Sequence, residues 1–341
     1  MTIGYITHRD CLRHDMGLHP ECPARLTAIN DRLIASGLDM ALVHYDAPLA
    51  ERAWLERVHD PAYLDDLEAR SPQGGLAWVD GDTAMNPDTL TAARRAAGAA
   101  ALAVDLVLSG KETRVFCAVR PPGHHAERNR AMGFCFYNNV AVAALHALEA
   151  HGLSRVAIVD FDVHHGNGTE HIVAGDRRLL FCSTFQHPFY PHSGYDSIDS
   201  NVVNAPLPAG ADGAAFAAAV EADWLPRLRA FAPELVLVSA GFDAHQADDM
   251  AGLNLVDSDY AWVTGELCAI AAQSAGGRII SLLEGGYDLH ALAHLRLAAF
   301  GADAQPHRAW PGHAGRDEGV GQGQRHVASA QLAQQEYREE S

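Results

Sequence analysis

The sequence has few basic residues for its acidic content. Its 341 residues contain 25 Lys and Arg against 43 Asp and Glu, so the formal net charge is −18 at pH 7. Nonspecific binding to nucleic acid depends on basic patches that neutralise phosphates, and this charge argues against that function. An acidic chain favours a cationic partner, but because many soluble proteins are acidic, the charge alone carries little weight.

Paired cysteines and long apolar runs are also lacking. The six cysteines show no CxxC spacing, and several stand among apolar residues, where they are expected to pack as small hydrophobic side chains. We therefore expect no disulfide framework and a reducing, cytoplasmic location. The N-terminus, MTIGYITHRD, predicts no signal peptide. No apolar stretch approaches the roughly 20 residues of a membrane span, so no membrane association is predicted.

Apolar runs that alternate with Ala- and Leu-rich stretches predict one large α/β domain. Hydrophobic residues make up 48% of the chain, and the alternation continues from 113 to 297 without a linker. The periodic apolar signal fades after Gly301, and we expect residues 301–341 to form a loosely ordered tail. We also predict strands at 3–7 and 179–185, and helices at 23–36, 60–70, 86–109, 138–151, 216–231 and 257–274.

Four further apolar runs each predict a buried strand that is followed by glycine and titratable side chains. The runs and the residues after them are 114–119 with His124 and His125, 156–159 with Asp160, Asp162 and His164, 235–240 with Asp243, and 278–283 with Tyr287. In open parallel sheets, ligands bind outside the carboxyl ends of the strands, so we expect these side chains to meet at one edge. A lone His-His pair is usually polar surface, but the joint pattern predicts a functional site.

The segment DFDVHHGNGTE, 160–170, is the most informative of the four. Asp160, Asp162 and His164 stand at alternate positions, which face one way in an extended chain. Two carboxylates and an imidazole on one face would repel or stay unpaired without a cation, and Zn, Fe and Mn all accept these ligands. The alternative is a polar strand end whose Asp residues cap the next helix. The other three strand ends make that alternative less favoured.

Six segments resemble the motifs of the histone deacetylase superfamily, which includes acetylpolyamine amidohydrolases and bacterial deacetylase-like amidohydrolases. They are HPECPARL at 19–26, PPGHHA at 121–126, GFCFYNNVA at 133–141, DFDVHHGNGT at 160–169, AGFDAH at 240–245 and LEGGYDL at 283–289. The resemblance covers about residues 3–298, and Asn167 with LEGG is closer to the class II branch. It implies a three-layer α/β/α fold of the arginase-deacetylase type, with a mostly parallel central sheet and residues 1–300 as the catalytic domain.

The resemblance also implies a role for each residue of the site. Asp162, His164 and Asp243 would hold Zn²⁺, or alternatively Fe²⁺, with one position left open for chemistry. His125 would be the general base and acid, and His124 would act mainly through its charge. The remaining catalytic roles are orientation of His124 by Asp160, orientation of His125 by Asn167, and donation to the oxyanion by Tyr287.

Other positions are carried over from the family in the same way. A structural K⁺ site would use Asp160, Asp162, His164, Ser183 and Thr184, mostly through backbone carbonyls. A substrate tunnel would be lined by Phe134, Tyr190, Met250 and Gly285, and Arg25 would lie near an acetate channel. The second tunnel wall is usually Phe in the family, so Tyr190 adds a polar tip. His192 stands where Gly is common and would narrow the mouth.

Three functions stay open at this stage. The first is a zinc-dependent deacetylase acting on N-acetyl-lysine, and the second is an amidohydrolase for acetylpolyamines or other small acylated amines. Met250 stands where an acidic gate for a polyamine would be expected, which counts against that substrate. The third is a non-catalytic acyl-lysine binder, which the intact Tyr287, His124 and His125 disfavour. An arginase-like two-manganese hydrolase would need further Asp and His ligands, and a homo-oligomer stays open.

Overall fold

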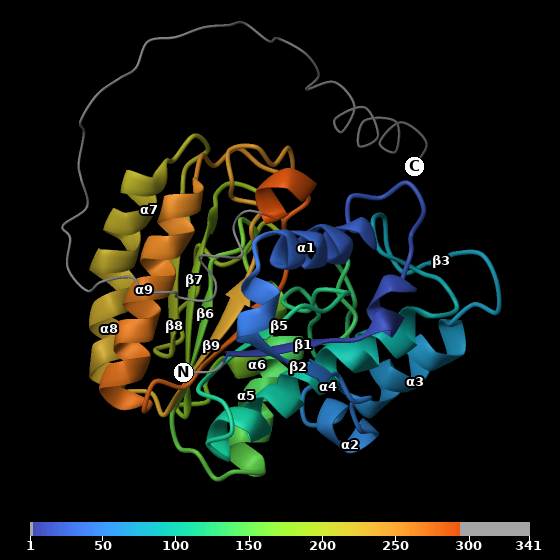
Figure 1. The fold of residues 1–341 in the computed structure, drawn as a ribbon, viewed down its shortest axis with the longest axis horizontal. Helices are drawn as coiled ribbons and strands as arrows, with labels where there is room; N and C mark the ends of the chain where they lie inside the picture. The colour runs from blue at the N-terminus through green and yellow to red at the C-terminus, as the bar shows by residue number, and fades with distance from the viewer. Residues whose placement is uncertain (1–2, 294–341) are drawn as a thin grey trace, which may run out of the picture. The chain divides into compact units, whose positions relative to one another are not determined.

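The computed structural model describes residues 3–293, which contain a sheet of eight strands with helices packed around it (Figure 1). The strand order is β2-β1-β5-β10-β9-β6-β7-β8, and every neighbouring pair is parallel. The bounds are β1 Ile3–Thr7, β2 Leu42–Asp46, β5 Arg114–Cys117, β6 Val156–Asp160, β7 Leu179–Gln186, β8 Val202–Leu207, β9 Leu235–Ala240 and β10 Ile279–Leu283. A separate antiparallel pair joins β3 Ala77–Trp78 to β4 Ala84–Met85.

Helices cover both faces of the sheet, which explains why its central strands are mostly apolar. Every residue of β6, β9 and β10 is buried. Figure 1 shows α7, α8 and α9 on one side of the strands and α4, α5 and α6 on the other. The helices are α1 Ala24–Ala35, α2 Arg52–Leu55, α3 Pro61–Arg70, α4 Thr89–Leu108, α5 Asn139–Glu149, α6 Asn167–Val173, α7 Gly213–Ala219, α8 Leu225–Phe231 and α9 Asp257–Ser274. The predicted three-layer α/β/α fold is confirmed.

Small residues dominate the buried face of the helix α4, and its neighbours can therefore approach closely. Eight of its alanines are buried, and the helix packs against α5 and β5. A Cβ at Gly98 would lie 2.0 Å from the carbonyl oxygen of Pro48, so glycine is required there. α4 also packs against α5, whose first residue, Asn139, donates to Pro121 beside the functional site.

The two edge strands, β2 and β8, were not predicted from the sequence. β2 is LVHYD and has no fully buried residue, and β8 carries Asn and Pro within VVNAPL. Edge strands tolerate polar residues and Pro, which weakens their sequence signal. The helix predicted at 216–231 begins earlier, at Gly213, where Asp212 caps it, and a π-helical segment (η3, Val220–Trp224) separates α7 from α8.

Three other expectations concern the C-terminal tail, membrane spans and disulfides. The tail predicted at 301–341 lies outside the described residues. Within residues 3–293, no helix is both long and apolar enough to cross a membrane. All six cysteines are free thiols, in keeping with the expectation of no disulfide framework.

Candidate metal centre and active site

The four strands that carry the sequence motifs are neighbours in the middle of the sheet. Their spatial order is β5-β10-β9-β6, although they follow one another along the chain as β5, β6, β9 and β10. Asp160 at the end of β6 is aligned with Ser239 of β9, and Leu283 at the end of β10 with Ala240 of β9. The carboxyl ends of the four strands therefore deliver their motifs to one edge of the sheet.

Asp162, His164 and Asp243 form a buried three-residue group at this edge. The Nδ1 atom of His164 lies 3.1 Å from Oδ1 of Asp162 and 3.2 Å from Oδ2 of Asp243. One ligand atom from each residue falls within 4.8 Å of the others. Two carboxylates and one imidazole are a ligand set suited to zinc or iron.

Turns, and not strand alternation, set the direction of these side chains. The strand β6 ends at Asp160, so the extended geometry expected through His164 is wrong. The Asp160 carboxylate accepts the main-chain N–H of Asp162, and the Asp162 carboxylate accepts that of His164, at 3.1 and 2.9 Å. Each is an Asx turn, a local bond that Asp forms with the backbone two residues on.

The pocket fits a divalent cation on its own chemistry. Burial and the charge of Asp162 raise the pKa of Asp243 to about 7. Burial opposes protonation of His164, but its hydrogen bonds to Asp162 and Asp243 raise its pKa to about 9. Without a metal the group thus retains protons that a dication would displace. A Cβ at Gly285 would lie 2.1 Å from Oδ2 of Asp243, so glycine keeps the space beside the ligands free.

The two adjacent histidines are each held by a different partner. The Nδ1 atom of His124 lies 3.0 Å from the Asp160 carboxylate, and the Nδ1 of His125 lies 2.8 Å from Oδ1 of Asn167. The Asn167 amide nitrogen donates to Glu127, which leaves its oxygen to accept from His125. The His125 Nδ1 therefore carries the proton, and its Nε2 lone pair is free to act as a base.

The surroundings of the two histidines shift their pKa values in opposite directions. Burial opposes protonation of His124, but Asp162 and Asp160 raise its pKa well above the usual value. Burial, followed by the nearby His124 and His164, holds the pKa of His125 well below its usual value. One site therefore contains a cationic imidazole beside a neutral one. Groups with pKa values pushed apart in this way suit separate electrostatic and acid-base roles.

We predict that Asn167→Asp raises the pKa of His125, because a carboxylate favours the imidazolium and an amide does not. Since the neutral form is the base, activity in the variant should fall at a higher pH on the acid side than in the wild type. The pH profile of kcat/KM measures this limb. An unmoved acid limb would show that His125 is not the titrating base.

Tyr287 stands on a loop that two charged side chains hold. The Arg25 guanidinium donates to the main-chain oxygens of Glu284 and Gly286 and lies 4.8 Å from the centre of the Tyr287 ring. The Asp248 carboxylate accepts the main-chain N–H of Tyr287. Burial raises the pKa of the Tyr287 phenol well above its usual value, despite the opposing charge of Arg25. The phenol therefore stays protonated and can donate a hydrogen bond.

The predicted tunnel residues lie on two sides of the site. Phe134 packs edge-on against Tyr287 at 5.9 Å, and it clusters with the half-buried Met250. Tyr190 packs edge-on against His125 at 5.2 Å. Phe134 has a φ of 68°, rare outside glycine, and its N–H donates to the Thr83 hydroxyl at 3.0 Å. His192, expected to narrow the mouth, is exposed and also has a positive φ, of 64°.

The residues expected to bind K⁺ also come together. Asp160 of β6 pairs in register with Ser183 of β7, and Thr184 follows in the same strand. All three are buried, and the Ser183 hydroxyl has no hydrogen-bond partner among residues 3–293. A buried hydroxyl without a partner is costly, and coordination of a cation would satisfy it.

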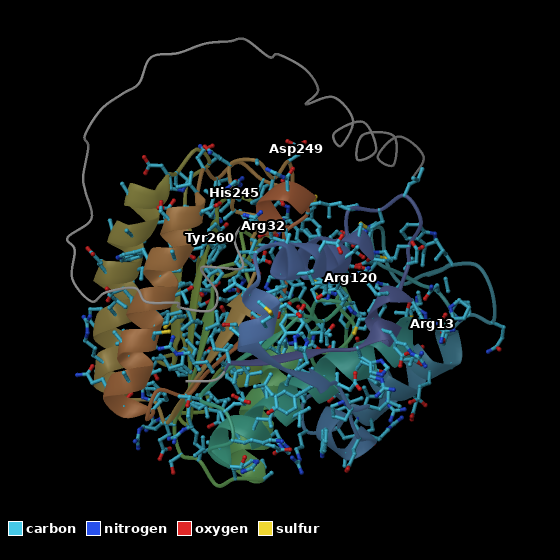
Figure 2. The ribbon with its side chains drawn as sticks, viewed as in Figure 1. Arg13, Arg32, Arg120, His245, Asp249 and Tyr260 are labelled. Atoms are coloured by element: carbon cyan, nitrogen blue, oxygen red, sulfur yellow. The ribbon has the colours of Figure 1, made fainter. Side chains whose placement is uncertain are left out.

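Several residues of the site were missed by sequence reasoning. The buried Glu284 accepts the main-chain N–H groups of Gly123 and His124, so it ties β10 to the turn after β5. Glu21 is also fully buried and binds both Arg25 and Arg120, the latter labelled in Figure 2. Asp82 lies close enough to raise the pKa of Tyr190, after the larger effect of burial. The sequence feature that could have identified them is a charged residue within an apolar motif, such as Glu284 in SLLEGG.

The sequence and fold of the chain are similar to those of known proteins. Residues 19–302 match the histone deacetylase domain. A histone deacetylase-like amidohydrolase from Pseudomonas aeruginosa is 37% identical over 79% of this chain and 72% of its own length. Polyamine deacetylase HDAC10 from Mus musculus is 40% identical over 80% of this chain, but the chain spans only 43% of that protein. The crystal structure of the HDA15 HD domain superposes with a TM-score of 0.83 at 33% identity, covering 88% of each chain. The chain belongs to the histone deacetylase family, a family of amide-bond hydrolases.

Proposed function

We propose that the chain is a zinc-dependent deacetylase that removes acetyl or other acyl groups from N-acetyl-lysine or similar amides. The observation that carries the proposal is the neutral His125 beside the three-residue group of Asp162, His164 and Asp243. The His125 Nδ1 is hydrogen-bonded to Asn167 at 2.8 Å, which leaves Nε2 available to accept a proton beside a group suited to bind a metal.

The described residues divide the chemistry of amide hydrolysis among them. A divalent ion bound by Asp162, His164 and Asp243 would supply Lewis acidity to the substrate carbonyl and to the attacking water. His125 takes the proton of that water at Nε2 and then gives it to the leaving amine. His124, cationic and held by Asp160, stabilises negative charge that develops on the substrate.

Tyr287 completes the site. Its phenol O–H donates to the carbonyl oxygen as negative charge develops there, and Arg25 and Asp248 hold the loop that carries it. A K⁺ ion near Ser183 would add positive potential behind the histidines and lower their pKa. The side chains of His124, His125 and Tyr287 and the three proposed metal ligands are all present, which argues against the alternative of a non-catalytic acyl-lysine binder.

Acetylpolyamine hydrolysis is the second candidate, and one observation favours it. Asp82 is a half-buried carboxyl near Tyr190, and burial with the neighbouring Asp80 raises its pKa to about 6. A carboxylate there could pair with a distal ammonium, and the mouse relative is named a polyamine deacetylase. Met250 argues the other way, because a thioether offers no charge to such an ammonium.

We predict that the zinc-loaded enzyme hydrolyses acetyl-lysine peptides or neutral small amides more efficiently than N-acetylspermidine. The ratio of kcat/KM values across such a panel tests the proposal. Met250→Glu should then raise the efficiency toward acetylspermidine about tenfold, the value of one modest charge-assisted contact, and the uncharged Met250→Gln should not. A wild-type preference for acetylspermidine that Asp82→Asn abolishes would establish the second candidate instead.

A further inference from the structure

A second group of metal-binding side chains lies away from the active site, between α4 and α5. Asp105 belongs to α4, His146 belongs to α5, and His151 follows the end of α5. The Nε2 atoms of His146 and His151 lie 2.9 and 2.7 Å from the same carboxylate oxygen, Oδ1 of Asp105. One candidate ligand atom from each residue falls within 4.8 Å of the others.

The group is separate from the catalytic centre. The first residue of α5, Asn139, donates to the carbonyl of Pro121 in the turn that leads to the catalytic histidines. His146 stands seven residues further along, roughly 10 Å at 1.5 Å per residue, and His151 lies beyond the end of the helix. None of the three residues contacts the catalytic group, so they have no part in the proposed reaction.

We propose that Asp105, His146 and His151 bind a borderline divalent ion such as Zn²⁺ or Ni²⁺. Ligand atoms about 2.0–2.1 Å from a tetrahedral ion are about 3.3 Å apart. The present separations of 2.7 and 2.9 Å would therefore need to open by only about half an ångström. Two imidazoles and a carboxylate are also the donor set that such ions prefer over Mg²⁺ or Ca²⁺.

Burial and exposure in the group suit an ion that keeps water as a ligand. The His146 side chain is 8% exposed and is fixed against the Trp54 ring at 5.2 Å. The side chains of Asp105 and His151 are 47% and 30% exposed, so solvent can reach the remaining coordination positions. With His146 fixed and Asp105 and His151 accessible, an ion can enter the site from solvent while α4 and α5 stay in place.

The site should bind more weakly than the catalytic centre. The Nδ1 atom of His146 is buried and has no hydrogen-bond partner among residues 3–293. Metal-bound histidines ordinarily donate this second nitrogen to a carboxylate or carbonyl, and loss of such a partner typically weakens affinity about 10- to 100-fold. An ion that joins α4 to α5 only in the folded chain should nevertheless raise the melting temperature.

The test begins with tag-free enzyme carrying one equivalent of zinc, which is then titrated with Ni²⁺. Bound metal is counted after equilibrium dialysis, and tryptophan fluorescence is followed because Ni²⁺ on His146 should quench the adjacent Trp54. We expect one saturable Ni²⁺ per chain and a higher melting temperature. His151→Ala and Asp105→Asn should each abolish that Ni²⁺, the quenching and the added stability, while deacylation by the zinc enzyme stays unchanged.

A matched control separates this site from scattered histidines, of which the chain has 20. His44 lies 3.0 Å from Asp39 and is 48% exposed, so it forms an accessible His–Asp pair with one imidazole. His44→Ala should retain the Ni²⁺ that His151→Ala loses. The proposal is wrong if the wild type binds no Ni²⁺ beyond its zinc, or if His151→Ala binds it as well as the wild type does.

Discussion

Replacement of Tyr287 by Phe should lower turnover about 100- to 1,000-fold, the usual effect of removing one oxyanion donor. The phenol is needed as negative charge develops on the carbonyl oxygen, so its loss falls on the chemical step more than on substrate binding. The pKa of this phenol is raised by burial, so the group stays protonated at neutral pH and donates a hydrogen bond. Single-turnover rates, together with KM, separate the two effects.

The control for this variant is the same chemical change on the other side of the site. Tyr190 packs against His125, but its ring is proposed to line the tunnel and not to donate in the reaction. Tyr190→Phe should therefore keep turnover close to that of the wild type. Tyr287→Phe should retain its metal and still bind a hydroxamate chelator, though more weakly. Wild-type turnover in Tyr287→Phe would mean that the oxyanion is stabilised by other groups.

Sequence patterns predicted the central strands because burial on both faces leaves a simple signature. Val156 to Val159 is a continuous apolar run, and Leu235 to Ala240 is apolar except for Ser239; both lie in fully buried strands. β2 and β8 were not predicted because an edge strand has only one neighbouring strand and tolerates His, Asn or Pro, which weakens its apolar pattern. The sequence also could not supply the spatial order β5-β10-β9-β6, since pairing of β10 between β5 and β9 depends on contacts far apart in the chain.

The site likewise contains residues that the sequence predicted and residues that it did not. His125 was predicted because it follows an apolar run and a glycine-containing turn, and the role of Asn167 was implied by the family resemblance. The structure places the two side chains 2.8 Å apart. Glu284 and Asp248 were missed because they act on backbone N–H groups, which no side-chain pattern records. The alternation argument for Asp162 reached a convergent group for the wrong reason, since turns and not an extended strand direct that side chain.

Asp243→Ala should abolish both metal binding and deacylation while the protein stays folded. The variant removes one of three proposed ligands, and two ligands hold an ion far less firmly in an open site. The fold should survive because burial and Asp162 already raise the pKa of Asp243 to about 7, a sign that this carboxylate is poorly tolerated without a cation. Its loss relieves that repulsion in the metal-free chain.

The measurement must distinguish the catalytic metal from an ion at Asp105. Zinc content is therefore determined in a His151→Ala background, with thermal unfolding followed by circular dichroism to check the fold. Asp249, labelled in Figure 2, is an exposed carboxylate on the same loop, and Asp249→Ala should keep one equivalent of zinc and full activity. If Asp243→Ala in this background still bound one equivalent of zinc, Asp243 would not be a ligand of the catalytic metal. A variant that lost zinc but kept its activity would instead remove the metal from the reaction and leave His125, His124 and Tyr287 to account for it.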